Sequence, residues 1–321
     1  MKILQLLLFQ VLLWYPGLLY SQIRWERVDS LFAPLPPSVH VWFTDDSLEG
    51  KPNRAWYISI PLKEKALWFD ADTALNRGLT PSTYFVRNNN PLVVVNCTFF
   101  SPERQNLNVV VDNGKMVSFN IPSVFNRMDS SYRYTTRSAI GIDRHRNADV
   151  AWIFTDPTKN LPYRMIKRPL VCSGKNPVLT TRMLIHSCND TGRKMIKRWK
   201  METAVGGGPG LITDGKINIT NEQERMFTGN AINDRHPRTA MGYTGSGKLI
   251  IMAIEGRFPG RAEGATLNQE AQLLKEIGCF EALNLDGGGS SCMLINGKQT
   301  ITPSDKSGQR PVPAVFIVKL K

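Results

Sequence analysis

The pattern of apolar and polar positions predicts a strand, a helix and a second strand in the C-terminal third of the chain. Residues 248–254 are almost wholly apolar, as in a buried strand. Apolar residues then recur at helical spacing over residues 267–277, after Thr266 and Gln269 at capping-box spacing. Residues 283–285 bring a second apolar run to a glycine-rich turn. This order, with short connections, predicts a right-handed β-α-β crossover with parallel strands.

A carboxylate follows each of the two predicted strands. Glu255 comes directly after the first strand, and Asp286 follows the second. Parallel strands end at the same edge of a sheet, where ligand clefts open. We expect the two carboxyl groups side by side on neighbouring strands, which lie about 4.8 Å apart, and so on the order of 5 to 10 Å from one another. Paired carboxylates at that separation hydrolyse glycosidic bonds.

The remaining pattern predicts short strands joined by turns. The expected strands cover residues 39–43, 55–60, 92–95, 109–111, 116–119, 137–143 and 148–154. A short helix is expected from Pro81, with Thr80 as its cap. Strands outnumber helices several-fold, so the predicted fold class is α+β, with a mixed, mainly antiparallel β-sheet, few helices and one β-α-β crossover near the C-terminus.

One strand motif occurs twice. Arg137 opens an Arg-Ser-Ala-Ile-Gly segment, and Arg238 opens the similar segment Arg-Thr-Ala-Met-Gly. An apolar strand follows each copy, which suggests an internal duplication. Only the second copy continues into Glu255-Gly256-Arg257, so the functional weight is expected there.

Six short motifs resemble those of one known family. In chain order they cover residues 94–100, 204–212, 236–242, 255–257, 264–267 and 284–291. Together they resemble the phosphodiester glycosidase (uncovering enzyme) family, from about residue 92 to the C-terminus with residues 172–199 unmatched. A single glycine run would be weak evidence, whereas several motifs in the same order are specific.

The resemblance implies an exported hydrolase that cleaves a glycosidic bond next to a phosphodiester, in a sugar phosphate or a cell-surface glycopolymer. Asp286 and Glu255 are then the catalytic pair. The residues expected to bind substrate and phosphate are Asn96, Phe99, Phe100, Arg137, Gly207, Gly208, Arg238, Thr239, Arg257, Gly287, Gly288, Gly289, Ser290 and Ser291. The family usually has aspartate where this chain has Glu255, and the extra methylene shifts the carboxylate by roughly an Ångström.

Several alternatives stay open at this point. Arg238 and Arg257 suit bidentate phosphate binding, yet either could form a structural ion pair with the carboxylates. A serine hydrolase using Ser290 and His236 lacks the Gly-x-Ser-x-Gly elbow. A non-catalytic protein that binds glycans or anionic polymers would keep the same fold. No cofactor is required, although the carboxylates Asp286 and Glu255 also suit a calcium or magnesium ion.

The start of the chain predicts export. Residues 1–21 combine a lysine, an apolar stretch and a small residue, as in a signal peptide. The apolar stretch is too short to span a membrane comfortably, so no stable membrane insertion is expected after cleavage. The predicted organisation is a signal peptide (1–21), an N-terminal extension packed on the main domain (22–90) and a phosphodiester glycosidase-like catalytic domain (91–321). The expected location is secreted or periplasmic.

The charge balance favours anionic partners. The formal net charge is +13, and export argues against nucleic acid, as does the lack of a basic recognition helix. Phosphodiester-linked glycans and anionic glycopolymers fit equally well, and so does a purely solubilising charge. Residues 193–200 are the densest basic cluster, expected as a helix with a solvated face or as a surface for an anionic polymer. Aromatic side chains such as Trp68 are expected mainly in packing, with sugar stacking as the alternative.

Five cysteines predict an incomplete disulfide framework, because an odd number leaves at least one thiol unpaired. Cys172 and Cys188 flank a segment that could fold back on itself, which makes them the best candidate pair. Cys279 and Cys292 bracket the Asp286 turn and are a second candidate. Cys97 is expected as a small buried side chain.

Overall fold

The computed structural model describes residues 23–75, 77–187 and 195–321. The predicted signal peptide, residues 1–21, lies outside them. The fold is α+β with mainly antiparallel sheets, as predicted from the sequence. No helix in the described ranges is long and apolar enough to cross a membrane.

The largest sheet has eight strands and carries the C-terminal motifs. Its strands are, in spatial order, β1 (Glu26–Arg27), β2 (His40–Thr44), β3 (Ala55–Pro61), β19 (Lys248–Ile254), β18 (Arg238–Thr244), β20 (Cys279–Asn284), β16 (Gly210–Thr213) and β17 (Lys216–Ile217). The segment predicted as an N-terminal extension supplies β1 to β3, and β3 pairs with β19 along its whole length.

Three further sheets complete the fold. The seven-stranded sheet contains β14 (Ile196–Arg198), β12 (Leu161–Met165), β11 (Ala148–Asp156), β10 (Arg137–Ile142), β15 (Thr203–Gly206), β6 (Val110–Asp112) and β7 (Lys115–Ser118). The five-stranded sheet contains β22 (Lys298–Gln299), β21 (Met293–Ile295), β5 (Val93–Asn96), β23 (Ala314–Leu320) and β4 (Leu67–Thr73). The three-stranded sheet contains β13 (Cys172–Gly174), β9 (Ser131–Tyr134) and β8 (Ser123–Asn126).

In the part of the chain that the structure describes, helices are short and few. They are α1 (Pro81–Arg87), α2 (Thr181–Ser187), α4 (Asn221–Glu224) and α5 (Leu267–Glu276), with single 3-10 turns η1 (Asp29–Phe32), η2 (Gly229–Ile232) and η3 (Gly288–Ser290). The predicted caps are present: Thr80 accepts from the backbone of Thr83, and Thr266 and Gln269 form a capping box on α5.

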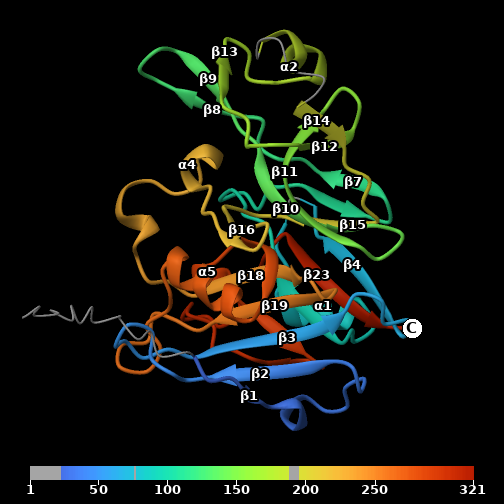
Figure 1. The fold of residues 1–321 in the computed structure, drawn as a ribbon, viewed down its shortest axis with the longest axis vertical. Coiled ribbons are helices and arrows are strands. Elements are labelled where there is room, and N and C mark those ends of the chain that lie inside the picture. Colours follow the sequence, from blue (N-terminus) through green and yellow to red (C-terminus); the bar gives the residue numbers. More distant parts are fainter. Residues whose placement is uncertain (1–22, 76, 188–194) are drawn as a thin grey trace, which may run out of the picture.

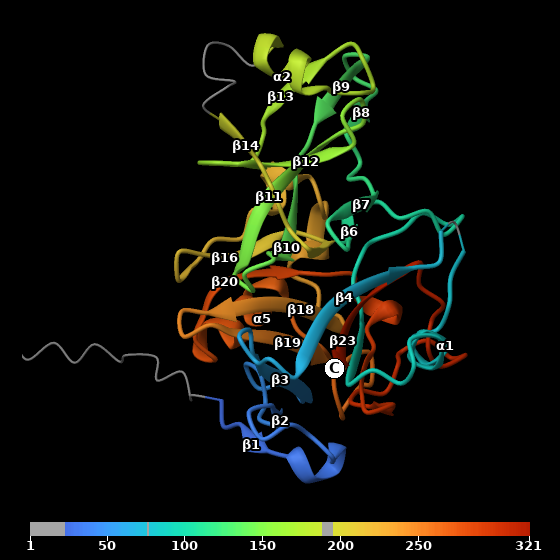
Figure 2. The ribbon, with the colours of Figure 1, turned by 90° about the vertical axis from the view of Figure 1, so that its right-hand side faces the viewer.

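The sheets pack around one main core. Alternate residues of β3, β19, β18 and β20 meet apolar side chains of the five- and seven-stranded sheets in this core. The other face of the eight-stranded sheet is covered by α5, and α1 packs on the five-stranded sheet. Figures 1 and 2 show the seven- and three-stranded sheets rising above the eight-stranded one. The glycine-rich loop after β15 connects two sheets, because β15 and β16 lie in different ones.

The predicted crossover is present, but its strands are not neighbours. Both β19 and β20 pair antiparallel with β18, which lies between them. The two strands therefore run in the same direction and end at the same edge, as predicted, while the expected side-by-side placement is wrong. Two strand spacings, roughly 10 Å, separate their backbones. The reason is that β18 and β19 form a hairpin, which occupies the position beside β20.

The two copies of the repeated motif occupy equivalent positions. Arg137 in β10 lies opposite Ile153 in β11, and Arg238 in β18 lies opposite Ile254 in β19. Each arginine-bearing strand also pairs antiparallel on its other side with a strand that leads into a glycine-rich turn, β15 and β20 respectively. This shared pairing pattern is what the predicted duplication requires.

The structure corrects one cysteine prediction. Cys279 and Cys292 are buried free thiols, so the expected cross-link between them is wrong. Cys97 is also a buried free thiol, as expected for a small apolar side chain. Cys188 lies outside the described residues, so its pairing with Cys172 stays a prediction.

Candidate functional site

Three strands deliver the candidate residues to one edge of the eight-stranded sheet. The segment before β18 lies between the ends of β19 and β20. Its Pro237 carbonyl accepts a hydrogen bond from Gly288 at 2.8 Å, and a Cβ on Gly256 would lie 2.7 Å from the Pro237 nitrogen. The turns after Glu255 and after Asp286 therefore both touch the segment that opens β18.

Asn96 fixes the Asp286 turn from the five-stranded sheet. Its side-chain Nδ2 donates to the Asp286 carbonyl at 2.6 Å, and its Oδ1 accepts from the Thr239 hydroxyl and the Cys292 backbone, each at 3.0 Å. The Asp286 N–H in turn donates to the Cys97 carbonyl at 2.8 Å. Asn96 and Thr239 are fully buried. They therefore position the turn and do not face a ligand, although the resemblance implied substrate contact.

Asp286 combines partial exposure with an unusual electrostatic environment. Its side chain is half-buried at the end of β20. Burial raises the pKa of Asp286 to about 7, against the opposing effects of the Ser290 hydroxyl, the Arg310 guanidinium and the Gly287 backbone. A carboxyl group in this state exchanges protons near neutral pH, as a general acid or base must.

An ion pair that the sequence motifs missed supports this turn. Arg310 forms a two-pronged pair with Asp305, at 2.7 and 2.8 Å, and its Nη1 donates to the Ser290 hydroxyl at 3.3 Å. A Cβ on Gly289 would overlap both the Asp305 carboxylate and the Arg310 guanidinium, so a larger residue there would displace this ion pair. Ser290 itself is buried and engaged in this network, an environment that does not expose it as a nucleophile.

Glu255 is held differently from Asp286. It is 1% exposed, and both its oxygens are engaged, one by the Arg261 guanidinium at 2.6 Å and the other by the Thr302 N–H at 2.7 Å. The ion pair that sequence reasoning considered is thus made with Arg261, and not with Arg238 or Arg257. Glu255 thereby connects the loop after β19 to Thr302, which lies in the segment that precedes Arg310.

Arg257 is an exposed cation at this edge. Its guanidinium lies against Gly288, where an added Cβ would approach Nη2 to 2.9 Å. Within the described residues it forms no ion pair with a carboxylate. Its Nη2 lies 3.5 Å from Nδ1 of His236. Burial, Arg238 and Arg257 lower the pKa of His236, so the imidazole stays neutral at neutral pH.

Arg238 faces the interior. It is 3% exposed, and its guanidinium donates to the carbonyls of Ala265 and Asp234 at 2.9 and 3.0 Å. Glu270 of α5 interacts electrostatically with Arg238, and its carboxyl oxygens are buried with no hydrogen-bond partner among the described residues. Burial raises the pKa of Glu270 to about 8. Arg238 thus carries a cation beneath the site, while Arg257 presents one at its surface.

The glycine-rich loop borders the same edge. Gly208 donates to the Asn284 carbonyl at 2.8 Å, and its own carbonyl accepts from the Asn284 side chain at 2.8 Å. At φ +126°, a Cβ on Gly208 would lie 2.7 Å from Oε2 of Glu224. The Gly207 carbonyl accepts from Asn108. The loop is therefore packed closely between β20 and α4.

Glu224 is a second buried carboxylate that the motifs did not include. It accepts hydrogen bonds from the Ser138 N–H and hydroxyl, the Gly210 N–H and the Thr220 hydroxyl, at 2.5 to 2.8 Å. Arg137 is also buried, and Glu224 acts as its counter-charge. The structure places Arg137 in this buried network and not on an exposed phosphate-binding surface.

Two aromatic side chains line the approach from β5. Phe99 is half-exposed and packs edge-on against Phe227, with ring centroids 5.9 Å apart. The Arg104 guanidinium lies over Phe100, 5.1 Å from the centroid of the Phe100 ring.

Ser291 is buried, and its hydroxyl has no hydrogen-bond partner in the described part of the chain. In the same described part, no group of three or more His, Cys, Asp or Glu side chains could hold a metal ion.

The comparisons with known proteins concern the segment that carries this site. Residues 175–319 match the phosphodiester glycosidase family. This confirms the resemblance drawn from the motifs, and the match includes residues 175–199, which the motifs left out.

Relatives are matched over a limited stretch. The chain is 35% identical over 103 residues to N-acetylglucosamine-1-phosphodiester alpha-N-acetylglucosaminidase of Mus musculus, which covers 30% of this chain and 20% of that protein. It is 38% identical over 95 residues to an uncharacterised SPbeta prophage-derived protein of Bacillus subtilis, which covers 30% of this chain and 14% of that protein. The chain thus matches a fifth or less of the length of these relatives.

Solved structures extend the likeness to nearly the whole chain. The catalytic domain of zebrafish N-acetylglucosamine-1-phosphodiester alpha-N-acetylglucosaminidase, auto-inhibited by its pro-peptide, superposes with a TM-score of 0.59 at 18% identity. The superposition covers 90% of this chain and 86% of that domain. At this identity the likeness shows a shared fold.

Proposed function

We propose that this chain, whose residues 175–319 match the phosphodiester glycosidase family, hydrolyses the glycosidic bond of a sugar-1-phosphodiester. The observation that carries the proposal is the Asp286 turn. A half-buried carboxyl group with a pKa raised to about 7 stands two residues from the glycine that lies against the exposed guanidinium of Arg257. A proton-exchanging group and an exposed cation are suited to cleavage next to a phosphate.

The leaving group decides how much acid catalysis is needed. When the bond between C1 of the sugar and the phosphate oxygen breaks, the leaving group is a phosphate monoester, whose second pKa is about 6. Such a group departs as an anion without full protonation. Arg257 is suited to stabilise the charge that develops on it, because guanidinium groups bind phosphate oxygens in pairs.

One carboxylate then suffices for proton transfer. In its ionised form, Asp286 is proposed to take the proton from the water that attacks C1. Asn96 fixes the backbone of Asp286, and Ser290 with Arg310 orients its carboxyl group. Glu255, expected from sequence as the second catalytic carboxylate, is proposed to act as an anchor, because both its oxygens are engaged by protein donors.

The substrate class follows from the named relatives. The mouse and zebrafish proteins are N-acetylglucosamine-1-phosphodiester alpha-N-acetylglucosaminidases, so an N-acetylglucosamine-1-phosphodiester is the first substrate to test. Export to the periplasm or the medium, as the first 21 residues predict, would bring the enzyme to cell-surface glycopolymers of this chemistry.

The test compares Asp286→Asn with the parent protein on a small N-acetylglucosamine-1-phosphodiester. The variant is expected to lose about 1,000-fold or more in kcat while its affinity for the substrate changes little. Asp214→Asn is the matched control, since Asp214 is exposed in the β16–β17 turn at φ +49°, which asparagine also adopts. Binding without turnover in the parent protein would instead support a non-catalytic glycan-binding protein.

A further inference from the structure

We propose that a groove on the seven-stranded sheet binds a sugar-phosphate chain, at a site separate from Asp286. The choice of ligand rests on the proposed function, while the groove itself follows from the structure. It is a hollow of about 780 Å³ between β7, the β10–β11 turn, the start of β12 and the segment after β14. This volume is within the range of ligand-binding clefts.

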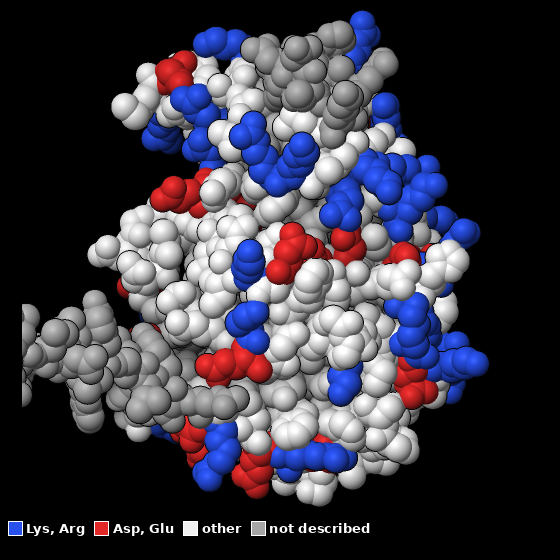
Figure 3. Space-filling model, in the orientation of Figure 1, with Lys and Arg blue, Asp and Glu red and all other residues white. Residues whose placement is uncertain are grey.

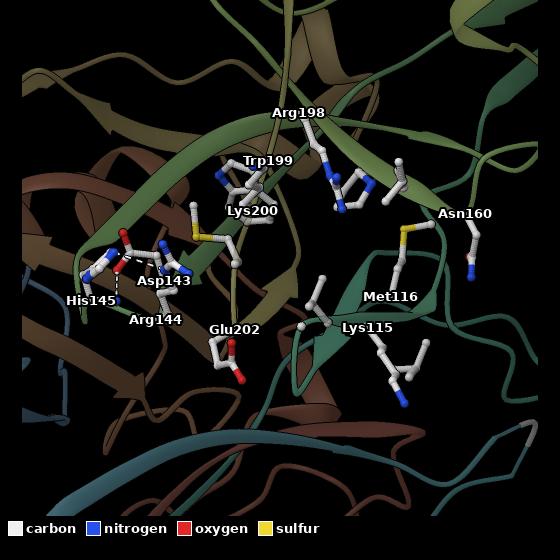
Figure 4. A pocket seen from close by; sticks show the side chains of 16 residues that line it. Lys115, Met116, Asp143, Arg144, His145, Asn160, Arg198, Trp199, Lys200 and Glu202 are labelled. Carbon is white, nitrogen blue, oxygen red and sulfur yellow. Dashed lines mark hydrogen bonds between the residues drawn. The ribbon is translucent and has the colours of Figure 1, made fainter.

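Cations dominate the lining of the groove. Lys115 comes from β7, Arg144 from the β10–β11 turn, and Arg198 and Lys200 from the end of β14 and the residues after it. Figure 4 shows Arg198 and Lys200 on one side of the hollow and Lys115 across from them. In the space-filling view, lysine and arginine side chains gather over β7, β12 and β14.

These charges are not neutralised by protein carboxylates. Within the described ranges none of the four forms an ion pair with Asp or Glu. The lining also contains two carboxylates, Asp143 and Glu202, and Asp143 is engaged by its own turn, where it accepts from the backbones of His145 and Asn147. Four exposed cations around one concavity concentrate positive potential there.

A buried tryptophan sets the direction of two of these side chains. Trp199 is 3% exposed, and its indole N–H donates to Asp149 at 2.6 Å. Side chains alternate along an extended segment, so Arg198 and Lys200 point away from the core that holds Trp199. Both are exposed. The arrangement is therefore built into the packing of the sheet.

The groove continues towards an exposed aromatic ring. A second hollow of about 190 Å³ shares Asp143, Arg144 and Glu202 with the first and ends at Trp68 of β4. Trp68 is 39% exposed, and the Lys321 ammonium lies 5.9 Å from its ring centroid. A flat apolar ring beside cations suits a ligand that alternates sugar rings with phosphates, whereas cations alone would suit any polyanion.

The test measures binding of a fluorescent chain of N-acetylglucosamine-1-phosphate repeats to the full-length protein by anisotropy. The triple variant Lys115→Glu, Arg198→Glu, Lys200→Glu is expected to bind about tenfold or more weakly. The matched control carries the same charge change on exposed lysines elsewhere, Lys175→Glu, Lys216→Glu and Lys248→Glu. Trp68→Ala is expected to weaken binding of this chain about threefold or more and to leave binding of inorganic polyphosphate unchanged.

The outcomes separate the groove from the active site. Turnover of a small N-acetylglucosamine-1-phosphodiester should be the same in all groove variants, and Asp286→Asn should still bind the chain. Equal loss in the two triple variants would overturn the groove. Polyphosphate binding as tight as that of the sugar-phosphate chain, with no effect of Trp68→Ala, would overturn the ligand assignment. An inactive parent protein that still binds through the groove would reject the proposed function alone.

Discussion

The chemistry of this protein depends on how differently its carboxyl groups are surrounded. Asp286 and Glu255 follow the ends of strands, whereas Glu224 and Glu270 lie in the helices α4 and α5. Glu255 and Glu224 accept several hydrogen bonds from protein donors. Asp286 is half-exposed with a raised pKa. Of these four carboxyl groups, Asp286 is the one that combines access to solvent with a pKa near neutral pH, which is why the mechanism is assigned to it.

The first prediction concerns the pH dependence of the reaction. If Asp286 acts as a base, only its ionised form is active, so kcat/KM should rise about tenfold per pH unit below about 7 and level off above it. The substrate phosphodiester does not titrate in this range, and burial with the neighbouring arginines lowers the pKa of His236. Initial rates between pH 5 and 9 measure the profile. A rate that falls as pH rises through 7 would show that Asp286 acts as an acid.

The second prediction concerns the exposed arginine. Arg257→Ala should lower kcat/KM on the sugar-1-phosphodiester about 100-fold, because the developing phosphate charge loses its partner. An aryl glycoside of the same sugar has no phosphate, so its cleavage should change little. Arg168→Ala, at another exposed arginine, is the control. Equal losses on both substrates would mean that Arg257 only maintains the structure of the turn.

At this scale the sequence identified some residues and missed others for a clear reason. Asp286 and Arg257 stand in contiguous motifs next to strand ends, which chain order reveals. Arg310 and Asp305 reach the Asp286 turn from a loop with no motif of its own. Glu224 interacts with Arg137, and Glu270 with Arg238, only because the tertiary fold brings together residues that are distant in sequence. Arg137 and Arg238 are buried, so they do not have the exposed phosphate-binding role expected of them. The residue type alone does not indicate whether a side chain is buried.

At the scale of elements, local signals were reliable. The capping box of Thr266 and Gln269 and the Thr80 cap were predicted and are present, because each depends on residues close in sequence. The order of strands was not predictable in this way. Apolar runs identify strands, but only long-range packing inserts β18 between β19 and β20.

The third prediction concerns Glu270 of α5, whose folded-state pKa is raised from 4.5 to about 8 by burial. The folded protein then holds a proton that the unfolded chain releases, so stability should fall as pH rises from about 4.5 through 8. Glu270→Gln removes this titration. The variant should gain on the order of 3 kcal/mol over the parent between pH 4.5 and 8.

Urea unfolding at the two pH values measures this difference, with Glu276→Gln on the exposed part of the same helix as the control. A stability difference between Glu270→Gln and the parent that is the same at both pH values would contradict the assigned titration. The variant also tests whether the uncompensated charge of Arg238 matters to turnover.

At the scale of the molecule, two copies of one strand pattern have taken different roles. The copy with Arg238 ends at the candidate active site. The copy with Arg137 lies in the seven-stranded sheet, whose strands and connecting turns line the basic groove. The fold class and the duplication could be predicted from local patterns, but the sheet partition could not, because β15 and β16 are neighbours in sequence and lie in different sheets.

The central claim is that water attacks the sugar carbon and not the phosphorus. Hydrolysis of an N-acetylglucosamine-1-phosphodiester in ¹⁸O-labelled water, followed by mass spectrometry of both products, tests it most directly. The account predicts the label in the hydroxyl at C1 of the released sugar and none in the phosphate monoester, with both products absent for Asp286→Asn. Label in the phosphate would contradict the account and identify the protein as a phosphodiesterase.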